Sequence, residues 1–374
     1  MRTNLYILAI LIFLTIFSGC SKAHTISVSN DSDFPRENEI VELNLENIPN
    51  MNISQSFRLI DEKNMEIPYQ LTYDNKLIFP VSLKHRETIN IKIEEGQPSV
   101  FDTIACGSFY PQRKDDLTWE NDRSAYRAYG PALQASGEKA YGYDIWTKSV
   151  ATPVVAKRYH EALDLHKPYH EDRGEGMDVY TVGPTLGAGA TALIDSTGNI
   201  VFPWAFKEYR ILDNGPLRFT ASLNYDGGES RLISLDAGEY LNRTTVSYPK
   251  AETKRVASGI VVHRQNPDGY VLNPDKGFMA YADLTDNSNA GNGVIFVGIV
   301  SEETDSMALL PFKEPIGDAI GHILALKDYN PGDDFTYYWG SGWSKGSMAD
   351  WDSWINYLQN FKNRLDKPLS VSIK

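Results

Sequence analysis

The stretch HILALKDYNPGDDFTYYWGSGWS, residues 322–344, decides the fold class of this 374-residue chain. Two apolar and aromatic runs flank NPGDD, in which asparagine, proline, glycine and aspartate are strong turn formers. We therefore predict two strands joined by a turn. Similar runs recur on the N-terminal side, punctuated by glycine, proline and Asp/Asn pairs at intervals typical of antiparallel sheets; they are YTVGP, NIVFPWAF, PLRFTASLNY, RLISLDAG, RTTVSYP, GIVVHR, GFMAYADL and GVIFVGIVS.

The segment from residue 117 to the end contains all seven tryptophans and most of the tyrosines. Only residues 348–367 show a helical period, which places Trp351, Trp354, Leu358 and Phe361 on one face. These patterns predict a mainly β chain whose residues 117–374 form a large antiparallel β-sandwich with a C-terminal helix. Sheets of this kind commonly carry ligands on a concave face.

A smaller β module precedes the large sandwich. Short alternating runs between residues 24 and 99 have the spacing of an immunoglobulin-like sandwich. Residues 101–116 break this alternation. We therefore assign residues 20–116 to a small β-sandwich with its linker, and residues 117–374 to the catalytic domain.

The N-terminus has the pattern of a bacterial lipoprotein signal peptide. Arg2 precedes a short apolar run, and the sequence FSGC ends at Cys20. We predict that residues 1–19 are removed and that Cys20 carries the lipid, so that the protein is attached to a membrane only through this anchor. The segment after Cys20 lacks an acidic export signal, which favours a periplasm-facing protein of the outer membrane.

Composition excludes some partners. The formal charge is −13, with 49 acidic against 36 basic residues, and this argues against nucleic acid as a ligand. An anionic substrate must therefore be held by a local basic cluster. The chain has two cysteines, Cys20 and Cys106. Because the lipid would occupy the Cys20 sulfur, we expect no disulfide within the chain.

Three of the seven histidines, His160, His166 and His170, fall in one window. The same window contains Tyr169 and Glu175 and leads into VGPTLGAGA, whose small residues allow a ligand or another strand to approach the backbone. Such polar residues are also common in surface turns that have no catalytic or binding role. A divalent metal held by His166, His170 and Asp178 is a second interpretation, although the spacing matches no known metal motif.

Two further groups of residues suit the binding of an acidic sugar. Arg123 and Arg127 lie four apart in WENDRSAYRAYGP, beside Tyr126, and guanidinium groups grip carboxylates, although surface ion pairs would explain them equally well. In YYWGSGWSKG, Trp343 and Lys345 are expected to face a cleft. His263 and His322 stand in apolar strands, where a histidine is commonly a core residue, but a strand can also direct one into a groove, and we include His322 among the candidate substrate-binding residues.

The motifs WENDRSAYRAYGP, GYDIWTK, YHEDRGEGMDVYTVGPTLGAGA, GPLRFTASLNY and YYWGSGWSKG resemble those of an uncharacterised-domain family of lipoproteins from polysaccharide-utilisation loci. One branch of that family contains ulvan oligosaccharide dehydratases. The resemblance implies a galactose-mutarotase-like supersandwich. It also implies elimination of water from a non-reducing-end glucuronate or iduronate linked to sulfated rhamnose, which gives a 4,5-unsaturated uronyl residue.

The residues are chemically compatible with this reaction. Removal of the proton next to a carboxylate needs a base near neutral pKa and a cation at the carboxylate. We expect His170 to be the base, supported by Glu175, His160 or Tyr169 to be the acid, and Arg123 with Arg127 to clamp the carboxylate. No cofactor is required. A polysaccharide lyase and a non-catalytic glycan-binding lipoprotein remain alternatives.

Overall fold

The computed structural model describes residues 24–49 and 56–374. The predicted signal peptide and Cys20 lie outside the described residues. No helix in the described part of the chain is both long and apolar enough to span a membrane.

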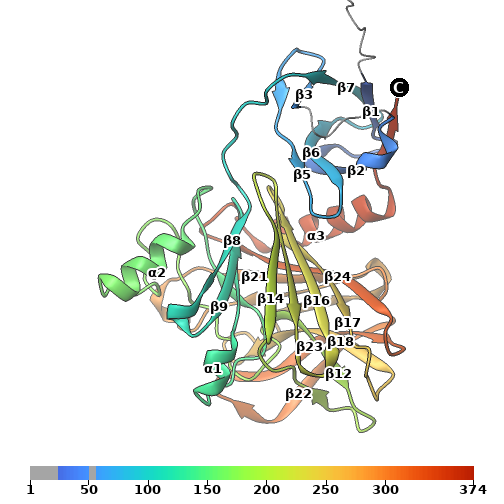
Figure 1. The fold of residues 1–374 in the computed structure, drawn as a ribbon. Helices are drawn as coiled ribbons and strands as arrows, with labels where there is room; N and C mark the ends of the chain where they lie inside the picture. The colour runs from blue at the N-terminus through green and yellow to red at the C-terminus, as the bar shows by residue number, and fades with distance from the viewer. Residues whose placement is uncertain (1–23, 50–55) are drawn as a thin grey trace, which may run out of the picture.

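The large sandwich consists of two antiparallel sheets, as the sequence predicts (Figure 1). Their inner faces enclose the main apolar core, which includes Trp339, Phe335 and Ile260. One sheet has five strands, in the order β13 (Ile200–Val201), β12 (Ala188–Ile194), β18 (Arg255–His263), β23 (Ala319–Asp328) and β22 (Ser306–Ile316). The other has eight, in the order β14 (Glu208–Asn214), β15 (Arg218–Asn224), β16 (Ser230–Asp236), β17 (Leu241–Ser247), β24 (Asp334–Trp343), β21 (Ile295–Val300), β20 (Phe278–Asp283) and β19 (Tyr270–Asn273).

The two strands of residues 322–344 exist, but they do not pair with each other. β23 pairs with β18 and β22, whereas β24 pairs with β17 and β21 in the opposite sheet. The intervening NPGDD turn therefore carries the chain from one sheet to the other. Each strand is hydrogen-bonded to a neighbour along both of its edges, and the turn joins the two layers of the sandwich.

The small sandwich is also confirmed, with one addition. It packs a three-stranded sheet, in the order β2 (Arg36–Asn44), β6 (Lys76–Leu83) and β5 (Gln70–Leu71), against a five-stranded sheet, in the order β25 (Ser370–Ile373), β1 (His24–Ser29), β7 (Thr88–Glu95), β3 (Phe57–Ile60) and β4 (Glu66–Ile67). Because β25 pairs antiparallel with β1, the end of the chain belongs to the small sandwich. The expected assignment of residues 117–374 to the large domain therefore fails at the C-terminus.

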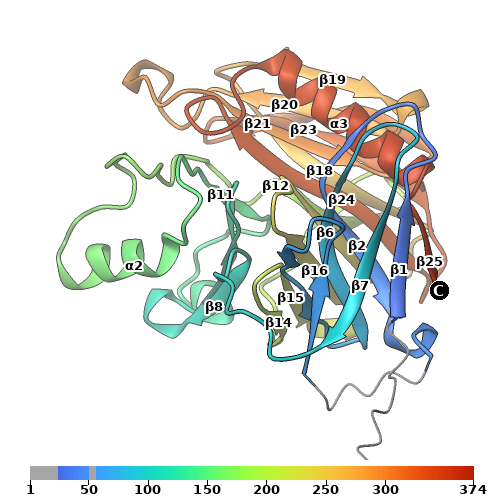
Figure 2. The same ribbon diagram turned by 90° about the horizontal axis from the view of Figure 1, so that it is seen from above.

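A third layer lies beside the large sandwich. Its four strands, in spatial order, are β11 (Asp144–Trp146), β10 (Ala125–Ala128), β9 (Asp116–Glu120) and β8 (Cys106–Tyr110). Short helix α1 (Pro131–Ala135) follows β10, and α2 (Val155–Asp164) projects from this layer to one side of the molecule (Figure 2). Helix α2 was not predicted from the sequence.

Helix α3 (Trp351–Asp366) is the one helix that we predicted. Its Trp354, Leu358 and Phe361 are buried against the outer face of the eight-stranded sheet. Asp350 caps its first turn by accepting a hydrogen bond from the Ser353 amide at 2.8 Å. α3 therefore covers part of that face between the large sandwich and the small one (Figure 1).

Candidate functional site

An open pocket of about 450 Å³ lies where three loops converge. The first loop, residues 169–179, contains His170 and Asp172. The second connects β20 to β21 and supplies Asp286, Asn287 and Asn292, and the third follows β24 and supplies Lys345. We call this the His170 pocket. Histidine, carboxylate, amide and ammonium groups therefore meet at one concave surface, a combination typical of binding and catalytic sites.

Local contacts fix the loop that carries His170. The Asp172 carboxylate accepts hydrogen bonds from the amides of Gly174 and Gly176, both at 2.9 Å. Gly176 has a φ of +98°, and a Cβ atom there would lie 2.2 Å from the Thr147 carbonyl oxygen. Only glycine fits such a position. The GEG sequence is thus needed to turn the chain back against β11.

The His170 imidazole is oriented from behind. Its Nδ1 lies 2.7 Å from the Asp178 carbonyl oxygen. Since a carbonyl can only accept, Nδ1 carries the hydrogen in this contact and Nε2 of the neutral ring is left with its lone pair. The side chain is 58% exposed. His170 therefore presents a basic nitrogen to the solvent-accessible pocket.

The other two loops bring one basic and one acidic side chain, Lys345 and Asp286, to the pocket that His170 lines. Lys345 has no ion-pair partner among the residues that the structure describes, so its ammonium group is available to an anionic ligand. Partial burial raises the pKa of Asp286, and the nearby charges of Asp283 and Asp318 act in the same direction, against the opposing charge of His170. The carboxyl of Asp286 consequently keeps its proton to a higher pH than an ordinary aspartate does.

A buried acidic cluster supports the floor behind the His170 loop. Arg127 forms ion pairs with Asp144 and with Asp178, the latter at 3.1 Å, and lies 3.6 Å from Asp116. Burial and the Asp144 charge raise the pKa of Asp178 well above its usual range. The expected role of Arg127 as a substrate clamp is therefore wrong, because its guanidinium is already surrounded by the chain's own carboxylates.

Arg123 does not join Arg127 at the site either. It contacts Asp122 at 3.3 Å, and its guanidinium lies over the Tyr240 ring, near α3. Tyr126 is buried, where its hydroxyl donates to the Tyr240 carbonyl at 2.7 Å. The residues of the expected arginine clamp thus have structural contacts and lie outside the His170 pocket.

The expected helpers of His170 are also placed elsewhere. Glu175 pairs with Lys157 at 2.5 Å, so the Asp178 carbonyl, and not Glu175, orients the imidazole. Tyr169 is buried against Trp146, and its hydroxyl accepts a hydrogen bond from Arg113 at 2.9 Å. His160 lies on the exposed surface of α2 and pairs with Asp164. Asp286, which lines the same pocket as His170, is the candidate acid in place of Tyr169 and His160.

His322 and Trp343 are core residues. His322 is fully buried, and its Nε2 accepts a hydrogen bond from the Leu186 amide at 3.0 Å, which contradicts a substrate-binding role. Trp343 is also buried, but its indole nitrogen donates to the Asn292 carbonyl at 2.8 Å. Trp343 therefore holds the loop that lines the His170 pocket from beneath, and it does not face the cleft as expected.

His263 is a buried histidine, as its apolar strand suggested. Its Nδ1 lies 2.6 Å from an Asp283 carboxylate oxygen. Burial by itself would lower the pKa of His263, but the hydrogen bond and the charge of Asp283 outweigh burial and leave the pKa raised. This pair anchors the end of β20, from which the Asp286 loop begins.

The metal interpretation finds no support in the described geometry. Within residues 24–49 and 56–374, no group of three His, Cys, Asp or Glu side chains is arranged to hold a metal ion. His166 is exposed at the end of α2 with a φ of +53°, and Asp178 is bound to Arg127. His166, His170 and Asp178 thus do not form the set that the sequence suggested.

The Asp286 loop was not among the predicted site segments, although its sequence carries a signal. The segment DLTDNSNAGNG, residues 283–293, is a polar and glycine-rich run between two apolar strands. Loops of this kind, held by a rigid sheet, carry function more often than the strands do.

Comparison with known proteins places the chain in a family. Residues 28–371 match the family described as Domain of unknown function (DUF4861). The chain belongs to this family. It is also 28% identical over 397 residues to "Uncharacterized protein P7" of Formosa agariphila, with 96% of this chain and 97% of that protein covered.

A solved structure shares the fold. It is described as a protein in the glycosyl hydrolase family 38 from Enterococcus faecalis, with a TM-score of 0.51 and 10% sequence identity. The match covers 95% of this chain and 48% of that chain, so this chain spans about half of its length. At this identity the likeness establishes the β-sandwich architecture alone.

Proposed function

We propose that this DUF4861 protein is a carbon–oxygen lyase that removes water from a uronic acid at the non-reducing end of an oligosaccharide. The observation that carries the proposal is the convergence of His170, Lys345 and Asp286 on one pocket. The resemblance of the sequence to the ulvan oligosaccharide dehydratases supports glucuronate or iduronate next to sulfated rhamnose as the substrate.

Each of the three groups has a role that its environment suits. Lys345 would bind the carboxylate of the sugar and neutralise the charge that develops when the C5 proton leaves. Nε2 of His170 would take that proton. Asp286, whose raised pKa favours the protonated form, would give a proton to the 4-hydroxyl. The C5–H and C4–O bonds break, the C4=C5 bond forms, and the 4-hydroxyl leaves as water.

The test uses uronate-terminated oligosaccharides. The protein should produce the absorbance of a conjugated double bond, together with a mass loss of one water and no change in chain length. A shortened product would identify a polysaccharide lyase instead. Saturable binding without turnover would identify a glycan-binding protein.

Variants of the pocket test the roles. Replacement His170→Ala should reduce kcat by about 10²–10⁴-fold, the range for loss of a general base. His160→Ala is the matched control, because His160 is an exposed histidine outside the pocket, and it should keep wild-type activity. Full turnover by His170→Ala would refute the assignment of the base.

Replacement Lys345→Met should raise KM and lower kcat/KM by about tenfold or more, because a charge-assisted contact to the carboxylate is lost. Lys167→Met provides the control, since Lys167 is also exposed and lies outside the His170 pocket.

Replacement Asp286→Asn should lower kcat while KM changes little. In the wild type, activity should fall as the pH rises through the raised pKa of Asp286, because the acid then loses its proton.

A further inference from the structure

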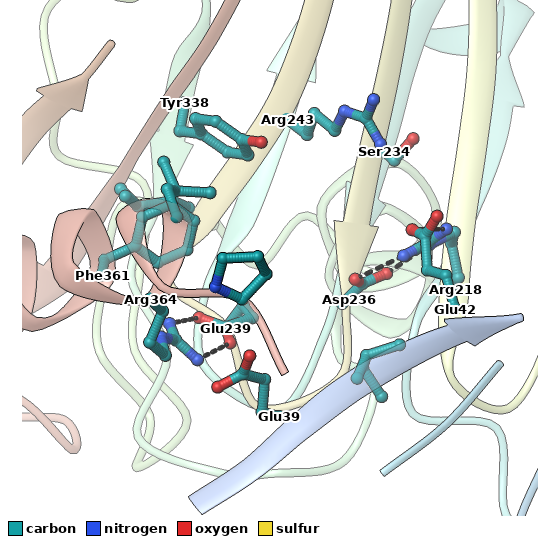
Figure 3. A pocket seen from close by; sticks show the side chains of 14 residues that line it. Glu39, Glu42, Arg218, Ser234, Asp236, Glu239, Arg243, Tyr338, Phe361 and Arg364 are labelled. Carbon is teal, nitrogen blue, oxygen red and sulfur yellow. Dashed lines mark hydrogen bonds and ion pairs between the residues drawn. The ribbon is translucent and has the colours of Figure 1, made fainter. Parts of the chain in front are cut away.

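A second cavity lies between the small sandwich, the eight-stranded sheet and α3 (Figure 3). It has a volume of about 330 Å³, within the range of roughly 300–1,000 Å³ for small-molecule sites. We call it the interdomain cavity. It shares no lining residue with the His170 pocket.

Three polar side chains form a row across its floor. Ser234 on β16 pairs with Arg243 on β17, and Arg243 pairs with Tyr338 on β24. Residues that are directly opposite on neighbouring strands point to the same face of a sheet. Figure 3 shows the Arg243 side chain between the Tyr338 hydroxyl and Ser234. A hydroxyl, a guanidinium and a phenol are thus presented together.

Arg243 is the uncompensated charge of this cavity. The other two arginines of the lining already form ion pairs. Arg218 pairs with Asp236 at 2.5 Å and with Glu42 at 2.7 Å. Arg364 pairs with Glu239 at 2.6 Å. The remaining carboxylate of the lining, Glu39, pairs with Arg36. Arg243 forms no such pair within the described chain. Its guanidinium can therefore accept an anion from outside the protein in a bidentate contact.

An aromatic wall stands beside this row. The Tyr338 and Phe361 rings meet edge to face with centroids 5.0 Å apart, and the Arg364 guanidinium lies 4.8 Å from the Phe361 centroid. These contacts hold the wall in place without a ligand. A ring with C–H groups on its faces can pack against it.

The carboxylates of the lining restrict the charge of the ligand. The carboxylates of Glu39, Glu42, Asp236 and Glu239 surround the cavity and would repel a multiply charged anion such as a phosphate. Their oxygens can still accept hydrogen bonds from hydroxyl groups. One free cation, several acceptors and an aromatic wall together suit a singly charged, polyhydroxylated ring.

We propose that the interdomain cavity is a binding site for an acidic saccharide, with a uronate carboxylate on Arg243 and the sugar ring against Tyr338 and Phe361. This site is additional to the His170 pocket and does not depend on the proposed reaction. Because β2 of the small sandwich supplies Glu39 and Glu42, a bound saccharide would bridge the two sandwiches and stabilise their packing.

The experiment is a calorimetric titration of the full-length chain with D-glucuronate, with glucose and inorganic phosphate as comparison ligands. We expect saturable glucuronate binding that is about tenfold or more tighter than binding of either comparison ligand. Arg243→Gln should weaken glucuronate binding by about tenfold or more, as expected for loss of a bidentate ion pair. Arg243 is exposed, so this variant is expected to fold.

Two control variants locate the binding. Arg210→Gln removes an exposed arginine of β14 in the same sheet and should leave the affinity of the Arg243 site unchanged. Lys345→Met removes the proposed carboxylate partner in the His170 pocket, so glucuronate binding at that pocket should be lost while binding at the Arg243 site remains. The proposal is overturned if wild type does not bind glucuronate, if Arg243→Gln binds as tightly as wild type, or if phosphate or glucose binds equally well. Loss of all binding in Lys345→Met would also overturn it, because the His170 pocket would then be the binding site.

Discussion

At the scale of single residues, burial decides what each ionisable group can do. His170 and His322 have the same side chain, but one faces a pocket and the other is fully enclosed. Aspartates divide in the same way. Asp195, at the surface, has its pKa lowered to about 2 by hydrogen bonds from Thr197 and Asn199. Burial raises the pKa of Asp116 to about 6, although Arg127 opposes this effect.

Asp116 should make stability depend on pH. Its carboxyl holds a proton more tightly in the folded chain than at the ordinary value of 3.8, so its contribution is complete below pH 3.8 and is lost as the pH rises to about 6. The shift of about two units corresponds to about 3 kcal/mol. Asp116→Asn cannot ionise, yet it can still accept the Tyr159 hydrogen bond. The free energy of unfolding of Asp116→Asn, relative to that of wild type, should therefore rise by about 3 kcal/mol from pH 3.5 to pH 7.

Urea unfolding at both pH values measures this difference. Asp195→Asn serves as the control of opposite sign, because a lowered pKa gives stability above pH 3.8 that is lost on acidification. That variant should lose stability relative to wild type as the pH rises. An equal difference between Asp116→Asn and wild type at both pH values would contradict the prediction.

His322 should contribute acid sensitivity. Burial, with a smaller effect from the His263 charge, lowers the pKa of His322 to about 3. A depressed pKa gives stability that is present above pH 6.5 and is lost as the pH falls towards 3. When the pH is lowered from 7 to 4.5, it falls two pH units below 6.5, and this should remove about 3 kcal/mol from the free energy of unfolding. His322→Gln keeps an acceptor for the Leu186 amide but cannot be protonated.

His322→Gln should therefore be less stable than wild type at pH 7, through lost packing, and should lose less stability on acidification. Denaturant unfolding at pH 7 and pH 4.5 gives both numbers. Parallel losses in the two proteins would show that His322 is not the responsible group.

At the scale of elements, loops and strands are positioned by buried polar contacts that patterns of hydrophobicity do not reveal. Glu120 on β9 accepts hydrogen bonds from the amides of Val154 and Val155 at the start of α2. Its other partner is Lys148, at 2.7 Å. In VGPTLGAGA, a Cβ on Gly189 would lie 2.7 Å from Trp339. The small residues there make room for the protein's own core.

Arg127 on β10 is the contact that holds this layer together. Arg127→Met would leave three carboxyl groups facing one another and should cost about 3–5 kcal/mol, the range for breaking a buried ion pair. Asp178→Asn should cost much less, about 1 kcal/mol or below, because burial and the Asp144 charge raise the pKa of Asp178 and so favour its protonated form, which an amide resembles.

Equilibrium urea unfolding of the two variants at pH 7 tests this ranking. The double replacement Arg127→Met with Asp144→Asn should recover part of the loss. An Asp178→Asn variant as unstable as Arg127→Met would show that Asp178 is ionised in the folded protein.

At the scale of the whole molecule, the two sandwiches are joined by more than the linker. The last strand, β25, pairs with the first, β1, with Val371 opposite Val28. Gln70 of the small sandwich inserts into the turn between β14 and β15, where its amide oxygen accepts hydrogen bonds from Leu217 and Arg218 at 3.0 and 2.8 Å. The first and last strands that the structure describes therefore belong to the same small unit, which packs on the large one.

Gln70→Ala should loosen this connection. It leaves two buried amide donors unpaired, each worth about 1–3 kcal/mol. We expect a lower urea midpoint and faster protease cleavage in residues 96–105, between the sandwiches. Gln359→Ala is the control, because the Gln359 side chain accepts an exposed hydrogen bond from Lys276 and has no other hydrogen-bond partner among the described residues. Unchanged cleavage in Gln70→Ala would show that this residue does not hold the two units together.

Sequence patterns determined the local part of the structure. Strand alternation identified both sandwiches, and the spacing of Trp354, Leu358 and Phe361 identified α3, because burial of one face acts on residues close in the chain. Helix α2 has a similar spacing in Val155, Tyr159 and Ala162, but it is short and projects from the molecule.

The site was only partly predictable, for a physical reason. Residue type made His170 and Lys345 candidates, since few side chains can act as a base or bind a carboxylate, and the structure places both in one pocket. His170 is more than a hundred residues from Asp286 and from Lys345 in the sequence, and no local pattern records which distant segments meet. Only the tertiary structure shows that Arg127 is paired with buried aspartates and that Asp286 lines the same pocket as His170. It also decided that the two strands of residues 322–344 enter opposite sheets, because pairing depends on which distant strands bury their free edges.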